Sequence, residues 1–183
     1  HEISIWNQDI HHYPDSSLKD YLDENKFDVL ILSLIAGYFQ YQKMKNLSKA
    51  INSSKNRPFY VMGGYGPTPE PEFFLKKSGC DVVGLGEGEV TISKLMDAIE
   101  NKTPLKNVPG IAWLENGKLQ QTSRPPLVHS LDSLEWSPYE LFDMKHYRMQ
   151  RSPKCTSTDF CFPMMSARGC SFKCTFCYRM DPG

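Results

Sequence analysis

The segment that most constrains the fold of this chain reads Asp28-Val-Leu-Ile-Leu-Ser-Leu34. Its nearly unbroken apolar run is typical of a parallel strand that is covered on both faces. Two shorter runs, Phe59-Tyr-Val-Met62 and Asp81-Val-Val-Gly-Leu85, have the same character. Segments with helical periodicity separate them, and strands that alternate with helices predict an α/β fold with a parallel sheet.

The rest of the chain extends this pattern in both directions. Residues 2–8 alternate apolar and polar side chains, which predicts a further strand. Asn116-Gly117 lies between two short strand-like segments and predicts a hairpin, because both turn residues need a positive φ. Helices are expected at residues 15–25, 44–51, 69–77 and 89–101. We therefore expect a sheet domain at 1–105, a hairpin and proline-rich linker at 106–160, and the start of another domain at 161–183.

The composition limits the classes of partner and compartment. Lys+Arg and Asp+Glu are equal at 21 each, so no basic field predicts binding to nucleic acid. No apolar run is long enough to span a membrane. The six cysteines lack the pattern of a disulfide framework and favour the reducing cytoplasm.

Three closely spaced cysteines near the end of the chain are the strongest chemical signal. Cys170, Cys174 and Cys177 form a C-x3-C-x2-C pattern. Cysteine thiolates are the usual ligands of iron–sulfur clusters. Three of them on one loop can bind three irons of a [4Fe-4S] cluster and leave the fourth iron open to another ligand.

Structural zinc is the alternative that these cysteines leave open. Its fourth ligand would be Cys155, Cys161 or His146. Zinc motifs more often use pairs of C-x2-C, and the sequence has no second pair. The spacing therefore favours the iron–sulfur cluster, whereas a zinc-bound tail would indicate a noncatalytic binding module.

Three loops that carry glycines follow the predicted strands, at Ser33–Gly37, Gly63–Thr68 and Gly86–Glu89. Ligands of doubly wound folds bind at the carboxyl ends of the strands. Glycine there lets a ligand approach the backbone closely. Each loop alone is better explained by turn chemistry, but together the three loops predict a ligand site at one edge of the sheet.

The cysteine segment resembles the radical S-adenosylmethionine (radical SAM) superfamily, whose signature is C-x3-C-x-φ-C with an aromatic residue at φ. That aromatic residue here is Phe176. The resemblance implies that Cys170, Cys174 and Cys177 hold a [4Fe-4S] cluster, that S-adenosylmethionine chelates the open iron, and that Phe176 lies near its adenine. It implies no catalytic side chain beyond the cluster ligands. It also implies a (β/α) barrel, of which residues 161–183 would hold the first strand and the cluster loop.

The sheet segments resemble cobalamin-binding domains, in which an S-x-L motif is followed by Gly-Gly at a separation like that of residues 36–62 here. Here Ser33-Leu-Ile35 precedes Gly63-Gly64, with isoleucine in place of leucine. The resemblance implies that Ser33 contacts the nucleotide tail of cobalamin and that the double glycine makes room for it. The family's D-x-H-x-x-G motif, whose histidine ligates cobalt, would precede residue 1. Loop similarity to cobalamin-dependent radical SAM enzymes implies further cobalamin contacts at Gly66, Pro67, Thr68, Gly86 and Glu87.

Together the two resemblances imply a Rossmann-like (flavodoxin-like) cobalamin-binding domain followed by a truncated radical SAM barrel. The implied function is reductive cleavage of S-adenosylmethionine and methylation of an unactivated carbon with the help of cobalamin. Oxidative ring closure, as in anaerobic magnesium-protoporphyrin cyclase, is the alternative within the same class. We expect a small-molecule substrate and a reducing partner such as flavodoxin or ferredoxin. Because most of the barrel would follow residue 183, the chain alone is expected to be inactive.

Overall fold

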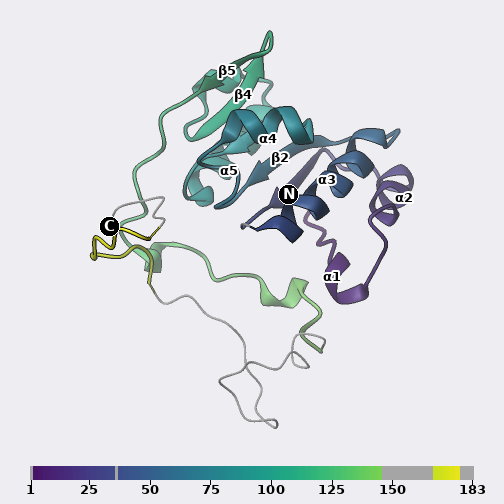
Figure 1. Ribbon diagram of the computed structural model, residues 1–183, viewed down its shortest axis with the longest axis horizontal. Helices are drawn as coiled ribbons and strands as arrows, with labels where there is room; N and C mark the ends of the chain where they lie inside the picture. The colour runs from purple at the N-terminus through teal and green to yellow at the C-terminus, as the bar shows by residue number, and fades with distance from the viewer. Residues whose placement is uncertain (1, 36, 146–166, 178–183) are drawn as a thin grey trace. The chain divides into compact units, whose positions relative to one another are not determined.

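The computed structural model of this 183-residue chain describes residues 2–35, 37–145 and 167–177 (Figure 1). The strands are β1 (Val29–Ser33), β2 (Phe59–Gly63), β3 (Val82–Gly84), β4 (Ile111–Glu115) and β5 (Lys118–Gln121). The α-helices are α1 (Gln8–His11), α2 (Ser17–Glu24), α3 (Tyr38–Ser53), α4 (Pro71–Ser78) and α5 (Gly88–Glu100). Three short 3-10 helices follow, η1 (Leu105–Asn107), η2 (Leu131–Ser133) and η3 (Tyr139–Leu141).

The chain divides into two compact units. One unit contains residues 14–127 and therefore all five strands, and the other contains residues 2–13 and 128–145. The cysteine-bearing segment is divided between them after Cys174. The apolar residues 162–165, where we expect the first strand of a barrel within 161–183, lie outside the described residues.

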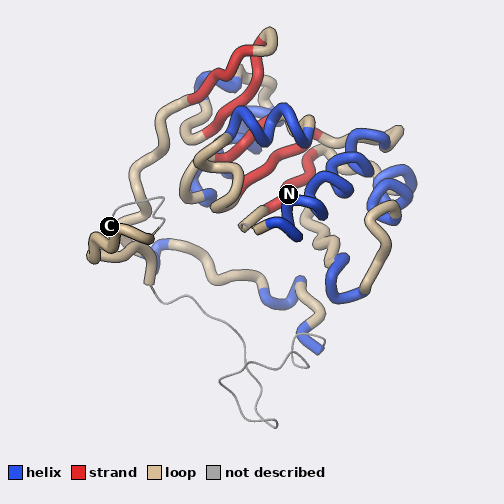
Figure 2. Tube along the Cα trace, viewed as in Figure 1, coloured by secondary structure: helices blue, strands red, loops and turns tan. Residues whose placement is uncertain are grey.

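The five strands form one sheet in the order β1-β2-β3-β4-β5 (red in Figure 2). Strands β1, β2 and β3 are parallel, whereas β4 pairs antiparallel with β3 and β5 pairs antiparallel with β4. Asn116 and Gly117 have the positive φ values, 52° and 76°, that the hairpin turn requires. The α/β prediction is confirmed, and the hairpin continues the sheet across the boundary expected at residue 105.

Alternate side chains of the central strands enter two cores on opposite faces of the sheet. Val61 and Val82 pack with Leu95 of α5 in one core. Tyr60 points to the other face, where its hydroxyl oxygen lies 2.9 Å from that of Ser48 on α3. Helix α4 contacts α3 and lies on this side of the sheet (Figure 1). Helices therefore cover both faces of the central strands, as the alternation of strands and helices predicts.

Local sequence explains where α4 begins and ends. Pro71 stands in the first turn, where its fixed φ suits a helix and its missing N–H costs no hydrogen bond. Gly79 ends the helix in the left-handed conformation, with φ of 68°, and donates its N–H to the Leu75 carbonyl at 3.0 Å. The helix predicted at 69–77 therefore lies close to its predicted bounds.

The prediction that β1 is covered on both faces is wrong on the side of α5. Ile31, in the middle of β1, is 52% exposed. Its register partner on β2, Val61, is 1% exposed. Strand β1 stands at the end of the sheet, and the core beneath α5 is centred on β2, β3 and β4. Val29, on the same face of β1, packs against this core. Within the described residues, the α5 side of β1 is therefore open only at Ile31 and Ser33.

The strand predicted at residues 2–8 is also wrong. Residues 2–7 form no strand, and α1 begins at Gln8. The side chain of Asn7 accepts a hydrogen bond from the Ile10 N–H at 3.4 Å and so caps this short helix. A strand needs a neighbour to satisfy its backbone, and no described strand pairs with this segment.

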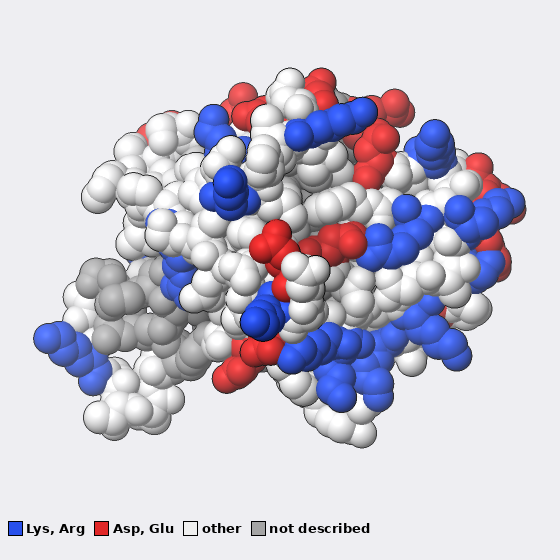
Figure 3. Space-filling model, turned by 90° about the horizontal axis from the view of Figure 1, so that it is seen from above, with Lys and Arg blue, Asp and Glu red and all other residues white. Residues whose placement is uncertain are grey.

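The surface carries charges of both signs. Figure 3 shows basic and acidic side chains close together over the face that it draws, and the sequence has a formal net charge of zero. None of the helices in the described ranges has the length and apolarity needed to span a bilayer.

Candidate functional site

The carboxyl ends of β1 and β2 bring Ser33 and Gly63 together. These two residues are register partners at the last position of each parallel strand. Because side chains alternate along a strand, both positions face the same side of the sheet as Val61, which is the side of α5. Ser33 is exposed there. The predicted serine and the first predicted glycine therefore form one surface.

Gly63 opens this surface to solvent. A Cβ atom built on Gly63 would meet no atom within 4 Å outside its chain neighbours. Its φ lies outside the left-handed region, so the backbone itself does not require glycine. The missing side chain instead leaves space beside Ser33, at the edge where doubly wound folds bind ligands.

Gly64 has a different role, because its surroundings are the protein itself. Its φ is +100°, and a Cβ atom there would lie 2.5 Å from the carbonyl oxygen of Leu34. The same carbonyl accepts the Gly66 N–H at 3.1 Å, and the Leu34 N–H donates to the Gly63 carbonyl at 2.9 Å. Gly64 therefore lets the loop after β2 cross closely over the end of β1.

Thr68 holds this loop from inside. Its side chain is buried, with the residue 4% exposed, and its hydroxyl donates to the Gly64 carbonyl at 2.8 Å. The Gly84 carbonyl, at the end of β3, lies 3.4 Å from the same hydroxyl. Pro67 is buried beside it. The structure gives Thr68 a role in joining the ends of β2 and β3, and its direct contact with cobalamin stays a prediction.

The third glycine loop leads from β3 into α5. Gly86 has φ of +82°, and a Cβ atom there would lie 3.3 Å from Cδ of Arg124. Glu87 is the N-cap residue of α5 and makes no side-chain capping hydrogen bond. Parallel strands β1, β2 and β3 place this loop at the same edge of the sheet as Ser33 and Gly63. The three loops predicted to act together thus share one edge.

The cysteine segment is described separately. Cys170, Cys174 and Cys177 are exposed thiols, none of them in a disulfide, and Phe176 is 91% exposed. Their donor type is the one that iron–sulfur clusters use. Within residues 2–35, 37–145 and 167–177, the structure brings no three His, Cys, Asp or Glu side chains into a metal-binding group. Their assignment as cluster ligands, and that of Phe176, stays a prediction, and Cys155, Cys161 and His146 lie outside the described residues.

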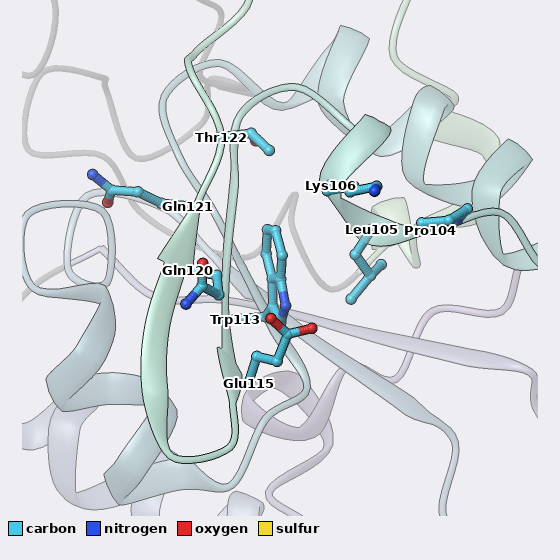
Figure 4. Close-up of a pocket in the computed structure, with 8 residues that line it drawn as sticks. All are labelled: Pro104, Leu105, Lys106, Trp113, Glu115, Gln120, Gln121 and Thr122. Carbon is cyan, nitrogen blue, oxygen red and sulfur yellow. The ribbon is translucent and has the colours of Figure 1, made fainter.

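A separate hollow of about 590 Å³ lies against the hairpin. Trp113 occupies its centre in Figure 4, with Pro104 and Leu105 on one side and Gln120 and Gln121 on the other. None of the predicted cofactor residues lines it. Its lining mixes amides, one indole and charges of both signs without converging on a reactive group, so we place the candidate site at the glycine loops instead.

The part of the chain that carries the three glycine loops matches a known protein family. Residues 1–96 match the family described as the B12 binding domain. The chain belongs to the B12-binding domain family. The match includes β1, β2 and β3, with the three loops that follow them.

Known relatives connect this B12-binding domain to cobalamin-dependent radical SAM enzymes. An uncharacterized methyltransferase of Pyrococcus horikoshii is 31% identical over 153 residues, which are 83% of this chain and 32% of the relative. The anaerobic magnesium-protoporphyrin IX monomethyl ester cyclase of Synechocystis sp. is 31% identical over 64% of this chain and 22% of its own length. The chain therefore spans about a third or less of these curated relatives.

Solved structures share the fold at low sequence identity. The radical S-adenosylmethionine methyltransferase TsrM from Kitasatospora setae, with cobalamin and a [4Fe-4S] cluster bound, superposes with a TM-score of 0.60 at 15% identity. The match covers 67% of this chain and 24% of TsrM. The radical enzyme OxsB, with aqua-cobalamin and S-adenosylmethionine bound, gives a TM-score of 0.52 at 18% identity over 66% of this chain and 17% of OxsB.

The B12-binding domain has a surface that fits part of its cofactor. The space that a Gly63 side chain would fill is empty of protein atoms, and the exposed Ser33 offers a hydroxyl beside it. Ile31 lies two residues before Ser33 on the same face and is half exposed. Sequence reasoning missed Ile31, although the period of two along β1, counted back from Ser33, could have found it.

Proposed function

We propose that this chain is the cobalamin-binding part, and the beginning of the catalytic domain, of a cobalamin-dependent radical SAM enzyme that methylates an unactivated carbon. The observation that carries the proposal is the pairing of Ser33 with an unfilled Gly63 at the edge of a B12-binding domain. The same chain continues into the C-x3-C-x2-C segment that iron–sulfur chemistry needs.

Each group of residues has a distinct task in this proposal. Ser33 and Gly63 receive the nucleotide tail of cobalamin, while Gly64 and Thr68 keep the loop in shape. Cys170, Cys174 and Cys177 supply thiolates to a [4Fe-4S] cluster, and Phe176 lies near the adenine of S-adenosylmethionine. When bound, cobalamin supplies methyl transfer and the cluster with S-adenosylmethionine supplies radical chemistry, so the protein's own contribution is binding, orientation and exclusion of competing reactions.

Oxidative ring closure is the second candidate reaction. The 31% identity to the Synechocystis cyclase supports it. The similarity to the methyltransferase of P. horikoshii extends over more of this chain, 83% against 64%, and for this reason methylation is preferred. In either case the proposed substrate is a small molecule, and the balanced charges give no support for a nucleic-acid substrate.

The proposal includes a reducing partner and a compartment. A [4Fe-4S] cluster of this class must receive an electron, and flavodoxin or ferredoxin is the class of protein that delivers one. The exposed thiols at Cys170, Cys174 and Cys177 would be stable in the cytoplasm, where thiols stay reduced.

Anaerobic EPR spectroscopy of the full-length gene product tests the proposal. The reduced protein should give a [4Fe-4S]+ signal that changes when S-adenosylmethionine is added, and Cys174→Ala should remove both the signal and the bound iron. Cys80→Ala is the matched control, since Cys80 is buried in the sheet domain and should leave the signal unchanged. Zinc in place of iron, with no EPR signal, would reject the radical reaction and favour a noncatalytic cobalamin-binding module.

A further inference from the structure

We propose that Ile31 is the apolar floor of the cobalamin site and packs against the flat ring of the base in the nucleotide tail. The inference rests on the cobalamin site proposed above and adds to it a residue that belongs to neither the serine nor the glycine motif. It assigns a function to the most exposed large apolar side chain within any strand of the sheet domain.

The exposure of Ile31 is unusual for its position. It stands at the middle of β1, yet 52% of its surface is accessible, whereas its register partner Val61 is 1% exposed. A large apolar side chain in the middle of a strand normally contributes to stability by being buried. Because about half of its side chain stays exposed, Ile31 adds little to stability through burial. Its exposed apolar surface is available to a ligand.

The position of Ile31 connects it to the tail site. Ile31 and Ser33 point to the same face because side chains alternate along β1, and Gly63 faces the same side. Two residues along a strand correspond to about 7 Å, a length that one fused heteroaromatic ring system can span. A base that lies over β1 would therefore contact the Ile31 side chain at one end and the Ser33 hydroxyl at the other.

The lining of this surface favours a planar heteroaromatic base over a packed helix. Ile31 offers an apolar side chain, Ser33 offers a hydrogen-bonding hydroxyl, and Gly63 offers backbone without a side chain. A flat base can lie against the glycine backbone, bury the isoleucine and use its ring nitrogen for the serine. A helix packed over the same surface would bury the Ser33 hydroxyl against apolar side chains, which is costly unless the hydroxyl finds a partner.

The test compares cobalamin with cobinamide, which has the same corrin ring but lacks the nucleotide tail. Dissociation constants for both would be measured with the full-length protein and its variants Ile31→Thr and Gly63→Val. Threonine keeps the β-branch that suits a strand, so the fold should survive. Ile3→Thr is the matched control, because Ile3 is 63% exposed and belongs to the other compact unit.

We expect Ile31→Thr to weaken cobalamin binding by about 5-fold, in keeping with the loss of part of one buried isoleucine side chain. Binding of cobinamide should be unchanged, and so should the melting temperature of the apoprotein. Gly63→Val should show the same selectivity for cobalamin with a larger loss, because its side chain would occupy the space of the tail. Ile3→Thr should alter neither constant.

Three results would overturn the inference while leaving the proposed function intact. They are unchanged cobalamin binding in Ile31→Thr, an equal loss for cobalamin and cobinamide, and a lower melting temperature of the apoprotein with an unchanged dissociation constant. The last result would mean that protein, and not cofactor, covers Ile31. Failure of the unmodified full-length protein to bind cobalamin would instead reject the proposed function itself.

Discussion

The carbonyl oxygen of Leu34 lies 2.5 Å from the point that a Cβ atom on Gly64 would occupy. A Cβ atom on the neighbouring Gly63 would have no atom within 4 Å, apart from those of its chain neighbours. The two adjacent glycines therefore differ in their surroundings. Gly64 has no room for a side chain, whereas a side chain on Gly63 would enter open space. This difference allows folding and cofactor binding to be separated by single substitutions.

Gly64→Ala should destabilise the sheet domain. The new methyl group would collide with the backbone of Leu34, and alanine would be strained at φ of +100°. We expect a loss of about 2–4 kcal/mol in the free energy of unfolding, measured by urea denaturation. Gly63→Ala should change this free energy by no more than about 0.5 kcal/mol, while weakening the binding of cobalamin. Equal stability losses in the two variants would contradict the assignment of separate roles.

Thr68→Val should also lower stability, through the loop after β2. Valine fills the same volume but cannot donate a hydrogen bond to the Gly64 carbonyl, which would be left without this partner. A loss of about 1 kcal/mol is expected for the removal of this one hydrogen bond, since the Gly64 carbonyl still accepts the Thr68 N–H at 3.3 Å. Thr68→Ser keeps the hydroxyl and should recover most of the loss. If serine were as destabilising as valine, packing and not the hydrogen bond would explain the burial of Thr68.

Asp23 gives the domain a dependence on pH. Its carboxylate accepts hydrogen bonds from the side chains of Lys19 and Ser54 and from the N–H of Lys55, and so joins α2 to the end of α3. These hydrogen bonds lower the pKa of Asp23 from 3.8 to about 2, and the bond from Lys19 has the largest effect. Because the folded pKa lies below the unfolded value, the stabilisation is fully present above pH 3.8 and is lost as the pH falls toward 2.

The substitution Asp23→Asn should therefore lower the urea midpoint at neutral pH and reduce the fall in stability between about pH 4 and pH 2. Asp20→Asn, at an exposed position of the same helix, is the matched control for the removal of one carboxylate from α2. An unchanged profile in Asp23→Asn would show that other carboxyl groups cause the acid sensitivity.

Thiol labelling should separate the cysteines by their surroundings. Burial raises the pKa of Cys80 to about 11, so very little of it is the reactive thiolate near neutral pH. The thiols of Cys170, Cys174 and Cys177 are exposed. In the metal-free chain, iodoacetamide should modify these three first, whereas Cys80 should react only after unfolding. Peptide mass spectrometry measures the order, and early labelling of Cys80 would show that the sheet domain opens.

The sequence predicts the strands of this fold well where local patterns and tertiary packing agree. Strands β2 and β3 have apolar side chains on both faces and helices on both faces, so their apolar runs identify them without ambiguity. Asn116-Gly117 predicts the hairpin because asparagine and glycine tolerate the positive φ values that the turn requires. The prediction of α/β architecture depends on these elements.

The predictions fail where the pairing and the order of the strands in the sheet determine the local structure and the burial of side chains. Residues 2–7 alternate like a strand, but alternation supplies no partner for their backbone, and the Asn7 cap favours a short helix from Gln8. Strand β1 reads as fully buried, yet its position at the end of the sheet exposes Ile31. Sequence alone does not give the order of strands, and for that reason the open face beside Ser33 became visible only in the structure.

The close contact between Gly64 and Leu34 has a consequence for how the family diverges. A domain that keeps this fold but loses its cofactor would still need glycine at the second position, because backbone crosses backbone there. The first position would be released and could acquire any side chain that a strand accepts. Related sequences should therefore keep glycine at the second position wherever the fold is kept. They should keep glycine at the first position only where the domain still binds a corrinoid.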